Sequence, residues 1–418
     1  MDIFRFHLVV RCAFKGVFSW ILVFGIIQGH CLEPSDVLVH SMLGGKVQLR
    51  PSFQILQHFD DNILFQQNDP EDDFLAVLNP AITLDVGNPG TRIHFALKYN
   101  FQSLHYLDND RFDSENHRVS LTSGFKGGKL SVSGTDSLGF LTDLQRRATN
   151  EDFQTDQIGL NVDRIVLSDN YRVNYQMTEK TSFYVNGRFS SIDYDETPNS
   201  SYIDVNTWTV ANGVSYQAFS KASIFTQVNY GQSATNPNSS RQPKGPHLSS
   251  LGGSIGLDGD ITPRLTGTVQ VGYETREYSD DEVPAPDEPT VNLNLNYRFG
   301  AKTSLGLILS RRSIVSASAP GQSLIVNGLT ININRAIGSS GKLFATLGAT
   351  LKKNDYEETT RYPDRADDDF RVYFDLIYNP REWINTGFGY EYIDYSTDQV
   401  RAQEYSVNRV TLFFGVGY

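Results

Sequence analysis

Apolar and polar residues alternate along most of the chain after residue 46, in segments of about ten to sixteen residues. In one segment, Asn292, Asn294 and Asn296 interleave with Leu293 and Leu295. The same alternation recurs in other segments, among them residues 93–102, 265–274 and 370–378. A period of two puts successive side chains on opposite faces of a strand, so the pattern predicts β-strands with one apolar and one polar face.

The connections between these segments alternate between short and long. Short ones such as Lys126–Lys129 and Asp260–Pro263 contain the Gly and Pro residues that favour tight turns. Long ones such as residues 58–73 and 355–367 are polar and acidic. Short turns on one side and long loops on the other are typical of transmembrane β-barrels. We therefore expect an all-β fold, a transmembrane antiparallel up-and-down β-barrel of about 18 strands, in a range of roughly 16 to 20.

The expected strands begin near residues 46, 74, 91, 116, 129, 162, 181, 203, 222, 248, 264, 289, 303, 322, 342, 368, 382 and 404. A soluble sandwich, barrel or propeller would show the same alternation but bury its apolar face. Aromatic residues at many strand ends, such as Tyr99, Phe125 and Tyr273, favour lipid because they suit interfacial girdles. The last segment also has the period-two pattern of the insertion signal that the outer-membrane assembly machinery reads, at Val410, Leu412, Phe414, Val416 and Tyr418.

Residues 1–31 are typical of a secretory signal peptide, with Arg5, Arg11 and Lys15 before or at the start of an apolar run that ends near Ile27. We expect residues 32–45 to be a periplasmic segment and residues 46–418 to be the barrel, in the outer membrane of a Gram-negative bacterium. Cys12 and Cys31 both fall within the signal, so the mature chain would have no disulfide and no thiolate ligand.

Basic residues are more frequent than acidic ones on the predicted polar faces, although the whole chain has a net charge of −12. The acidic total argues against a nucleic-acid partner. The polar-face bases are Arg50, Lys98, Arg118, Arg172, Arg188, Arg276, Arg298, Lys352 and Arg371. The polar-face acids are Asp85, Glu274, Asp375 and Glu391. An excess of bases in a lumen would lower the barrier for anions. Pairing of bases with acids, or a register shift of one residue, would weaken that preference.

The long loops are acidic, with clusters of acids at residues 60–73, 280–288 and 355–369. Such clusters could hold Ca²⁺ or Mg²⁺ and bridge to lipopolysaccharide, but none has the spacing of a defined calcium loop. A solvated loop is the simpler interpretation. The segment 138–161 has apolar residues of its own together with Arg146 and Arg147. It could enter the lumen as a constriction lined by those two arginines, or form an extra hairpin above the membrane.

Catalytic and metal-binding patterns are absent from the sequence. An embedded hydrolase would need a nucleophile, a histidine base and a group that orients the base. His58 near Asp60, and His105 near Asp108, are the only candidates for the base, and both are interpreted as loop residues. We therefore expect no enzyme activity, no catalytic residue, no bound metal and no cofactor.

Short motifs in the first strands resemble a known family. They are Asn79-Pro80-Ala81, Leu97-Lys98-Tyr99, Tyr106 and Asn116-His117-Arg118. Together with the signal and Tyr418, they resemble the Putative beta-barrel porin 2 family of outer-membrane proteins. The resemblance implies a barrel, and members often occur with exopolysaccharide synthesis and export functions. It implies no particular binding residues.

Two hypotheses of function follow. The first is a porin-like pore for passive transport or export of small or polymeric solutes, anionic or saccharide in nature. The alternative is a closed barrel whose acidic loops act in binding cations, lipopolysaccharide or partners, or in exopolysaccharide assembly. The expected partners are outer-membrane lipid and lipopolysaccharide, the outer-membrane assembly machinery and polysaccharide export components.

Overall fold

The computed structural model describes residues 39–42, 44, 46–87, 90–142, 163–195, 203–237, 245–280, 283, 285, 287–316, 321–359, 362–398 and 404–417. These residues form antiparallel strands and a short 3-10 helix, η1 (Asp110–Phe112). The strands are β1 (His40–Met42), β2 (Val47–Asp60), β3 (Asp73–Val86), β4 (Ile93–Tyr106), β5 (Ser114–Gly127), β6 (Leu130–Leu141), β7 (Arg164–Gln176), β8 (Thr181–Tyr194), β9 (Ile203–Tyr216), β10 (Ala222–Pro237), β11 (Leu248–Asp260), β12 (Leu265–Tyr278), β13 (Glu288–Arg298), β14 (Thr303–Val315), β15 (Ser323–Ile337), β16 (Leu343–Tyr356), β17 (Arg365–Arg381), β18 (Ile384–Thr397) and β19 (Tyr405–Gly417). Within these ranges no helix is both long and apolar enough to cross a membrane.

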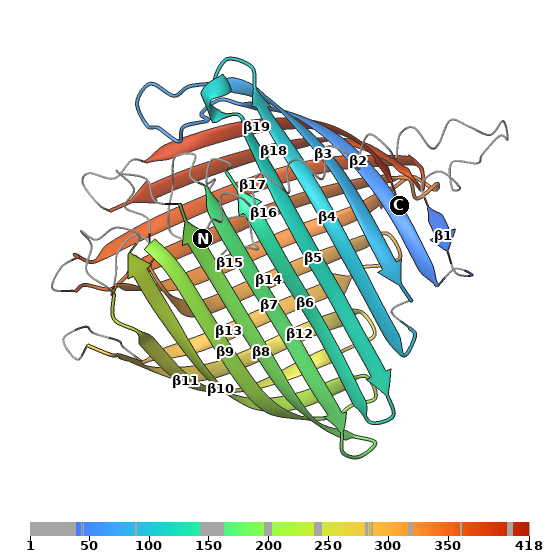
Figure 1. The fold of residues 1–418 in the computed structure, drawn as a ribbon, viewed down its shortest axis with the longest axis vertical. Helices are drawn as coiled ribbons and strands as arrows, with labels where there is room; N and C mark the ends of the chain where they lie inside the picture. The colour runs from blue at the N-terminus through green and yellow to red at the C-terminus, as the bar shows by residue number, and fades with distance from the viewer. Residues whose placement is uncertain are drawn as a thin grey trace, which may run out of the picture.

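Strands β2 to β19 form one closed antiparallel sheet of 18 strands, in which each strand pairs with its sequence neighbours (Figure 1). The barrel closes where β19 pairs with β2, from Arg409 opposite Asp60 to Gly417 opposite Ser52. The short β1 pairs with β2 opposite Val47–Leu49, beyond the last residue pair of β19. The structure confirms the predicted up-and-down barrel, and each barrel strand begins within three residues of its predicted start.

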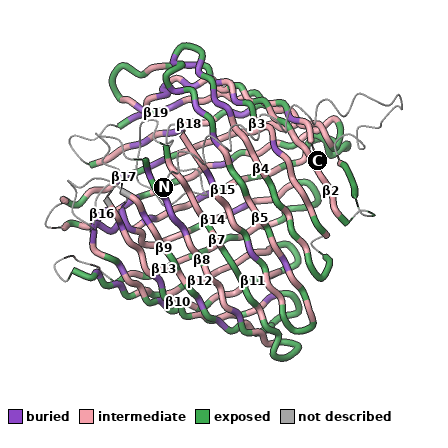
Figure 2. Tube along the Cα trace, in the orientation of Figure 1, coloured by how far each residue is buried: buried purple, intermediate pink, exposed green. Residues whose placement is uncertain are grey.

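The two faces of the wall differ in the way that the alternation predicts, and Figure 2 shows exposed and less exposed positions alternating along the strands. One face carries large, exposed apolar side chains, such as Phe95 and Leu97 on β4 and Leu412 on β19. On the other face, the Arg276 side chain of β12 reaches Ser323 on β15, three strands away. Only the concave side lets distant strands meet, so this face lines the lumen. A closed sheet of this size leaves room for water inside.

One pair of acids breaks the apolar pattern of the outer face. Asp136 on β6 lies directly opposite Asp169 on β7, and both share the face of Leu138 and Val173. The Tyr171 hydroxyl donates a 2.6 Å hydrogen bond to Asp136. Both acids stand near the middle of their strands, so two carboxyl groups face the hydrocarbon region, where such groups are costly.

Candidate functional site

The lumen is lined by bases without acids along one part of the wall. Lys98 on β4, Arg118 on β5, Arg172 on β7 and Arg188 on β8 all lie on the lumen face by register. Among the described residues of β4 to β10, the strand pairing places no Asp or Glu on that face. We refer to this part of the lumen as the basic wall.

Two arginines of the basic wall interact with side chains of other strands. The Arg172 guanidinium stacks 3.9 Å from the centre of the Tyr184 ring, and the Tyr184 hydroxyl donates to Gln227 at 3.0 Å. Arg188 lies within electrostatic range of Arg312 on β14, six strands away. Two cationic side chains therefore approach each other across the lumen at this level.

The opposite part of the lumen is lined by amides and hydroxyls. Strand β13, nine strands from β4 in a barrel of 18, places Asn292, Asn294 and Asn296 on the lumen face. On β15, the Asn334 amide donates to Asn332 at 2.9 Å and accepts from Thr346 at 2.8 Å. We refer to β13–β16 at this level as the amide wall. It offers neutral donors and acceptors directly across from the bases.

Some of the remaining predicted lumen residues form ion pairs with one another. Arg50 donates to Asp85 at 2.8 Å, and Arg371 pairs with Glu391 at 3.2 Å. Strand pairing puts the other predicted residues on the lumen face as well, namely Arg298, Lys352 and Asp375. Within the part of the chain that the structure describes, Lys98, Arg118, Arg188 and Arg298 have no acidic partner.

A buried chain of charges crosses the closing seam of the barrel. Arg409 on β19 donates to Glu391 at 3.0 Å and to Asp60 at 2.8 Å. Glu391 in turn pairs with Arg371, so alternating charges join β17, β18, β19 and β2. The sequence analysis missed Arg409, although its position between the outward residues Asn408 and Val410 would have assigned it to the lumen face.

The loop at residues 61–72 folds into the mouth of the barrel. Ile63 is 2% exposed and packs with Leu75, Tyr106 and other residues of β3, β4 and η1. Phe65 is 4% exposed and packs with Ile393, Tyr395, Tyr405 and Val407 on the other side of the seam. This segment, which we call the seam loop, therefore fills the mouth above β18, β19, β2 and β3.

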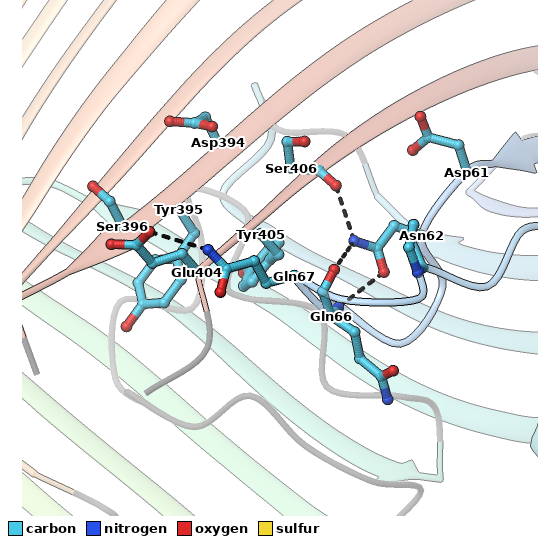
Figure 3. Close-up of a pocket in the computed structure, with 11 residues that line it drawn as sticks. Asp61, Asn62, Gln66, Gln67, Asp394, Tyr395, Ser396, Glu404, Tyr405 and Ser406 are labelled. Carbon is cyan, nitrogen blue, oxygen red and sulfur yellow. Dashed lines mark hydrogen bonds between the residues drawn. The ribbon is translucent and has the colours of Figure 1, made fainter. Parts of the chain in front are cut away.

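Polar contacts hold the seam loop to the end of β19, and Figure 3 shows the cleft beside it. The Asn62 amide donates to the carbonyls of Gln66 and Ser406, at 2.7 and 3.0 Å. The Asp61 carboxylate accepts from the backbone and side chain of Asn408, both at 2.7 Å. The cleft has a volume of about 330 Å³ and is lined by polar and acidic side chains, including Asp394 and Glu404. No Lys, Arg or His is among the residues that line it.

The acidic loop clusters are in part buried structure, which corrects the interpretation of them as solvated loops. Asp60, Asp73 and Asp367 are each at most 1% exposed. Asp60 pairs with Arg409, and Asp73 accepts from the backbone N–H groups of residues 107–109 and from the Asn109 side chain. Asp73 thereby fixes the loop between β4 and β5. Asp60 and Asp73 are anchors because each meets several donors, which offset the cost of burying its charge.

A second group of loops covers the mouth above β11–β16. Val283 and Ala285 pack on Leu248, Tyr278 and Val315. Beneath them the Arg276 guanidinium donates to Ser323 at 2.8 Å and faces Glu274 and Glu357, each at 4.0 Å. Burial raises the pKa of Glu357 to about 7, while Arg276 opposes the rise and Glu288 adds to it. Near neutral pH this carboxyl therefore changes its charge.

Some predicted features lie outside the residues that the structure describes. The signal peptide, Arg146, Arg147 and Tyr418 lie outside them. On β19, Leu412 and Phe414 are exposed on the outer face, which Val410 and Val416 share. His58 contacts Thr411 at 2.8 Å. Among the described residues, no group of three or more His, Cys, Asp or Glu is arranged to hold a metal ion.

Comparisons with known proteins agree with a barrel. A model of the Putative beta-barrel porin 2 family matches residues 43–416. A comparison with curated proteins finds no match. Pseudomonas aeruginosa OpdQ is similar at 11% identity, over 89% of this chain and 99% of that chain, with a TM-score of 0.45. OccK2 (OpdF) from the same organism, solved in complex with glucuronate, is similar at 10% identity, over 88% and 98%, with a TM-score of 0.45.

Proposed function

This chain belongs to the Putative beta-barrel porin 2 family of outer-membrane barrels, and we propose that it is a passive pore that prefers hydroxylated anions. The observation that carries the proposal is the basic wall. Four bases line the lumen face of β4–β8, where the described strands place no acid. Uncompensated positive charge beside a low-dielectric wall attracts anions and repels cations.

The amide wall supports the second part of the proposal. Asn292, Asn294 and Asn296 follow one another along the lumen face of β13, opposite the basic wall. Amide groups donate and accept hydrogen bonds, which suits hydroxyl groups. A solute with both a carboxylate and several hydroxyls, such as a sugar acid, carries a group that suits each wall. A narrower form of the proposal is export of an anionic polysaccharide, with export components and lipopolysaccharide as partners in a Gram-negative outer membrane.

The test is the reversal potential of the refolded barrel in a planar bilayer under a salt gradient. We expect an anion preference that falls when Lys98, Arg118 and Arg188 are all changed to Gln. The matched control changes Lys129, Lys180 and Lys302 to Gln. These lysines lie in the short turns between strands, at the end of the barrel opposite the mouth. A cation preference in the unmodified protein, or an equal effect of both triple variants, would reject the basic wall as the selectivity element.

Solute competition tests the amide wall. Glucuronate should reduce the chloride current more than propionate, which lacks hydroxyls, and more than glucose, which lacks charge. Changing Asn292, Asn294 and Asn296 to Ala should make glucuronate and propionate equivalent. Equal competition by both acids in the unmodified barrel would leave an anion pore without preference for hydroxylated solutes.

A closed barrel that acts through its loops is the alternative, and the in-folded loops on both sides of the mouth favour it. A folded barrel with no conductance that still binds Ca²⁺ would support this alternative and contradict the pore.

A further inference from the structure

The outer face of the barrel carries a second polar arrangement, beyond the lumen and its mouth. The Ser103 hydroxyl on β4 contacts Nε2 of His105 at 2.8 Å. The other ring nitrogen of His105, Nδ1, lies 3.0 Å from the Asp113 carboxylate. Asp113 is itself fixed, because its second oxygen accepts the backbone N–H of Tyr106 at 2.8 Å. A hydroxyl, an imidazole and a carboxylate in this order are the parts of a nucleophilic serine site.

Two local features bring the three groups together. Ser103 and His105 are two residues apart on one strand, so they project from the same face. The loop after β4 turns back through η1 and delivers Asp113 to that face, just before β5 begins. The acid nearer in the sequence is Asp108, but the carboxylate that meets the His105 ring is that of Asp113.

The position of Ser103 relative to the membrane defines the substrate. Ser103 shares its face with Ile93, Phe95 and Leu97, which are 51%, 44% and 43% exposed and face lipid. It stands ten residues after the start of β4, which is roughly 26 Å above the turn side for a strand tilted by about 40°. That height is the upper edge of the apolar band. A lipid in the outer leaflet would lay its chain along Tyr99 and Phe101, which share this face, and its ester at the level of Ser103.

We propose that Ser103, His105 and Asp113 form an acyl-ester hydrolase site on the outer wall, which acts on lipids of the outer leaflet. Ser103 and His105 are the catalytic residues, and Asp113 is a positioning residue. The shared chemistry of the substrates is an ester of a membrane-embedded acyl chain. Phospholipids and the acyl groups of lipid A both carry such esters.

The reaction balances with water as the second reactant. The Ser103 oxygen attacks the ester carbonyl carbon while its proton passes to Nε2 of His105. The C–O bond to the alcohol breaks, and the alcohol oxygen takes that proton from His105, which leaves an acyl-serine. Water then attacks the acyl-serine and gives a proton to His105. Collapse releases the fatty acid and returns the proton to Ser103. Asp113 accepts a hydrogen bond from the Nδ1–H group of His105, and its negative charge stabilises the imidazolium in both steps.

The surroundings of the site set the access of a substrate to it. Ser103 is 7% exposed and lies between its strand partners Leu78 and Glu115, so the ester reaches it through a narrow approach. His105 and Asp113 are more open, with side chains 54% and 36% exposed. His117, which contacts the Tyr99 hydroxyl at 2.9 Å, lies on the same face.

The experiment uses the full-length refolded barrel in vesicles that contain either a phospholipid or lipid A, each labelled in an ester-linked acyl chain. We expect release of labelled fatty acid from at least one of the two, and the comparison identifies the source. Ser103→Ala and His105→Ala should each lower the rate at least a hundredfold. The matched control is Ser123→Ala, because Ser123 lies on the same outer face of β5 and has no such histidine contact in the described structure.

Two further readouts separate catalysis from a structural role. A fluorophosphonate should label Ser103 in the unmodified barrel, and more slowly in Asp113→Asn, whose pH–rate profile should also change. Single-channel conductance should be the same in Ser103→Ala, so a failure of the pore and a failure of the hydrolase are independent results. Absence of both hydrolysis and labelling in a folded barrel, or equal rates in the unmodified protein and Ser103→Ala, would overturn the proposal.

Discussion

The seam loop should control how wide the mouth of the barrel is, and Phe65 is the residue that tests this. Phe65→Ala removes a side chain that is 4% exposed and whose ring lies 5.2 Å from that of Tyr405. Loss of a buried Phe costs about 3–5 kcal/mol. At about 1.4 kcal/mol for each factor of ten, the lower figure shifts the docking equilibrium of the loop by about two orders of magnitude. The mouth should therefore spend far more time without the loop.

Single-channel recording measures this directly. We expect Phe65→Ala to show a larger mean conductance, or more frequent steps to a larger level, than the unmodified barrel at the same voltage. The control is Asp69→Gly, because Asp69 is exposed and shares the positive φ of Phe65, 60° against 56°. Glycine relieves that backbone strain without removing a buried contact, so its conductance should be unchanged. A Phe65→Ala barrel that is folded and conducts like the unmodified protein would refute the gating role of the loop.

Three other predictions concern stability and pH. Arg409→Ala leaves Asp60 buried without its partner and should lower the free energy of unfolding by about 3–5 kcal/mol in a urea titration of the barrel in vesicles. Adding Asp60→Asn to the same chain should partly restore the stability. An equal loss in the single and the double variant would contradict the pairing. Changing Asp136 and Asp169 to Leu should raise the free energy of unfolding in the same assay by about 1–3 kcal/mol, since two carboxyl groups are removed from the lipid face. A lower free energy of unfolding would show that this face meets something other than lipid. Because burial raises the pKa of Glu357 to about 7, the packed mouth holds its proton more tightly than an open one. The stabilisation that this proton gives to the packed mouth is therefore complete near pH 4 and is lost as pH rises through about 7. Current fluctuations should increase over that interval in the unmodified barrel and become independent of pH in Glu357→Gln.

The strands were predictable because their signal is local. Alternation along a segment such as 290–298 depends only on which side chains face lipid and which face water. It placed Lys98, Arg118 and Arg188 on the face opposite the apolar residues without knowledge of any neighbour.

The loop anchors were not predictable, because their partners are distant in sequence or depend on the path of a loop. Asp60 is buried by Arg409, which is 349 residues away. Asp73 is buried by the backbone N–H groups of another loop. His105 has Asp108 as its nearest following acid in the sequence, but the turn at η1 brings Asp113 to its ring instead. An alternating pattern contains no information about such contacts.

The seam between β19 and β2 also has a consequence for the order in which the molecule assembles. Its nine residue pairs join the first barrel strand to the last, so they can form only after the whole chain has emerged. Phe65 meets Tyr405 and Val407 only once that seam exists. Contacts between such distant positions form slowly. Docking of the seam loop is therefore the final event of folding. Before β19 pairs with β2, the seam loop does not block the mouth of the barrel.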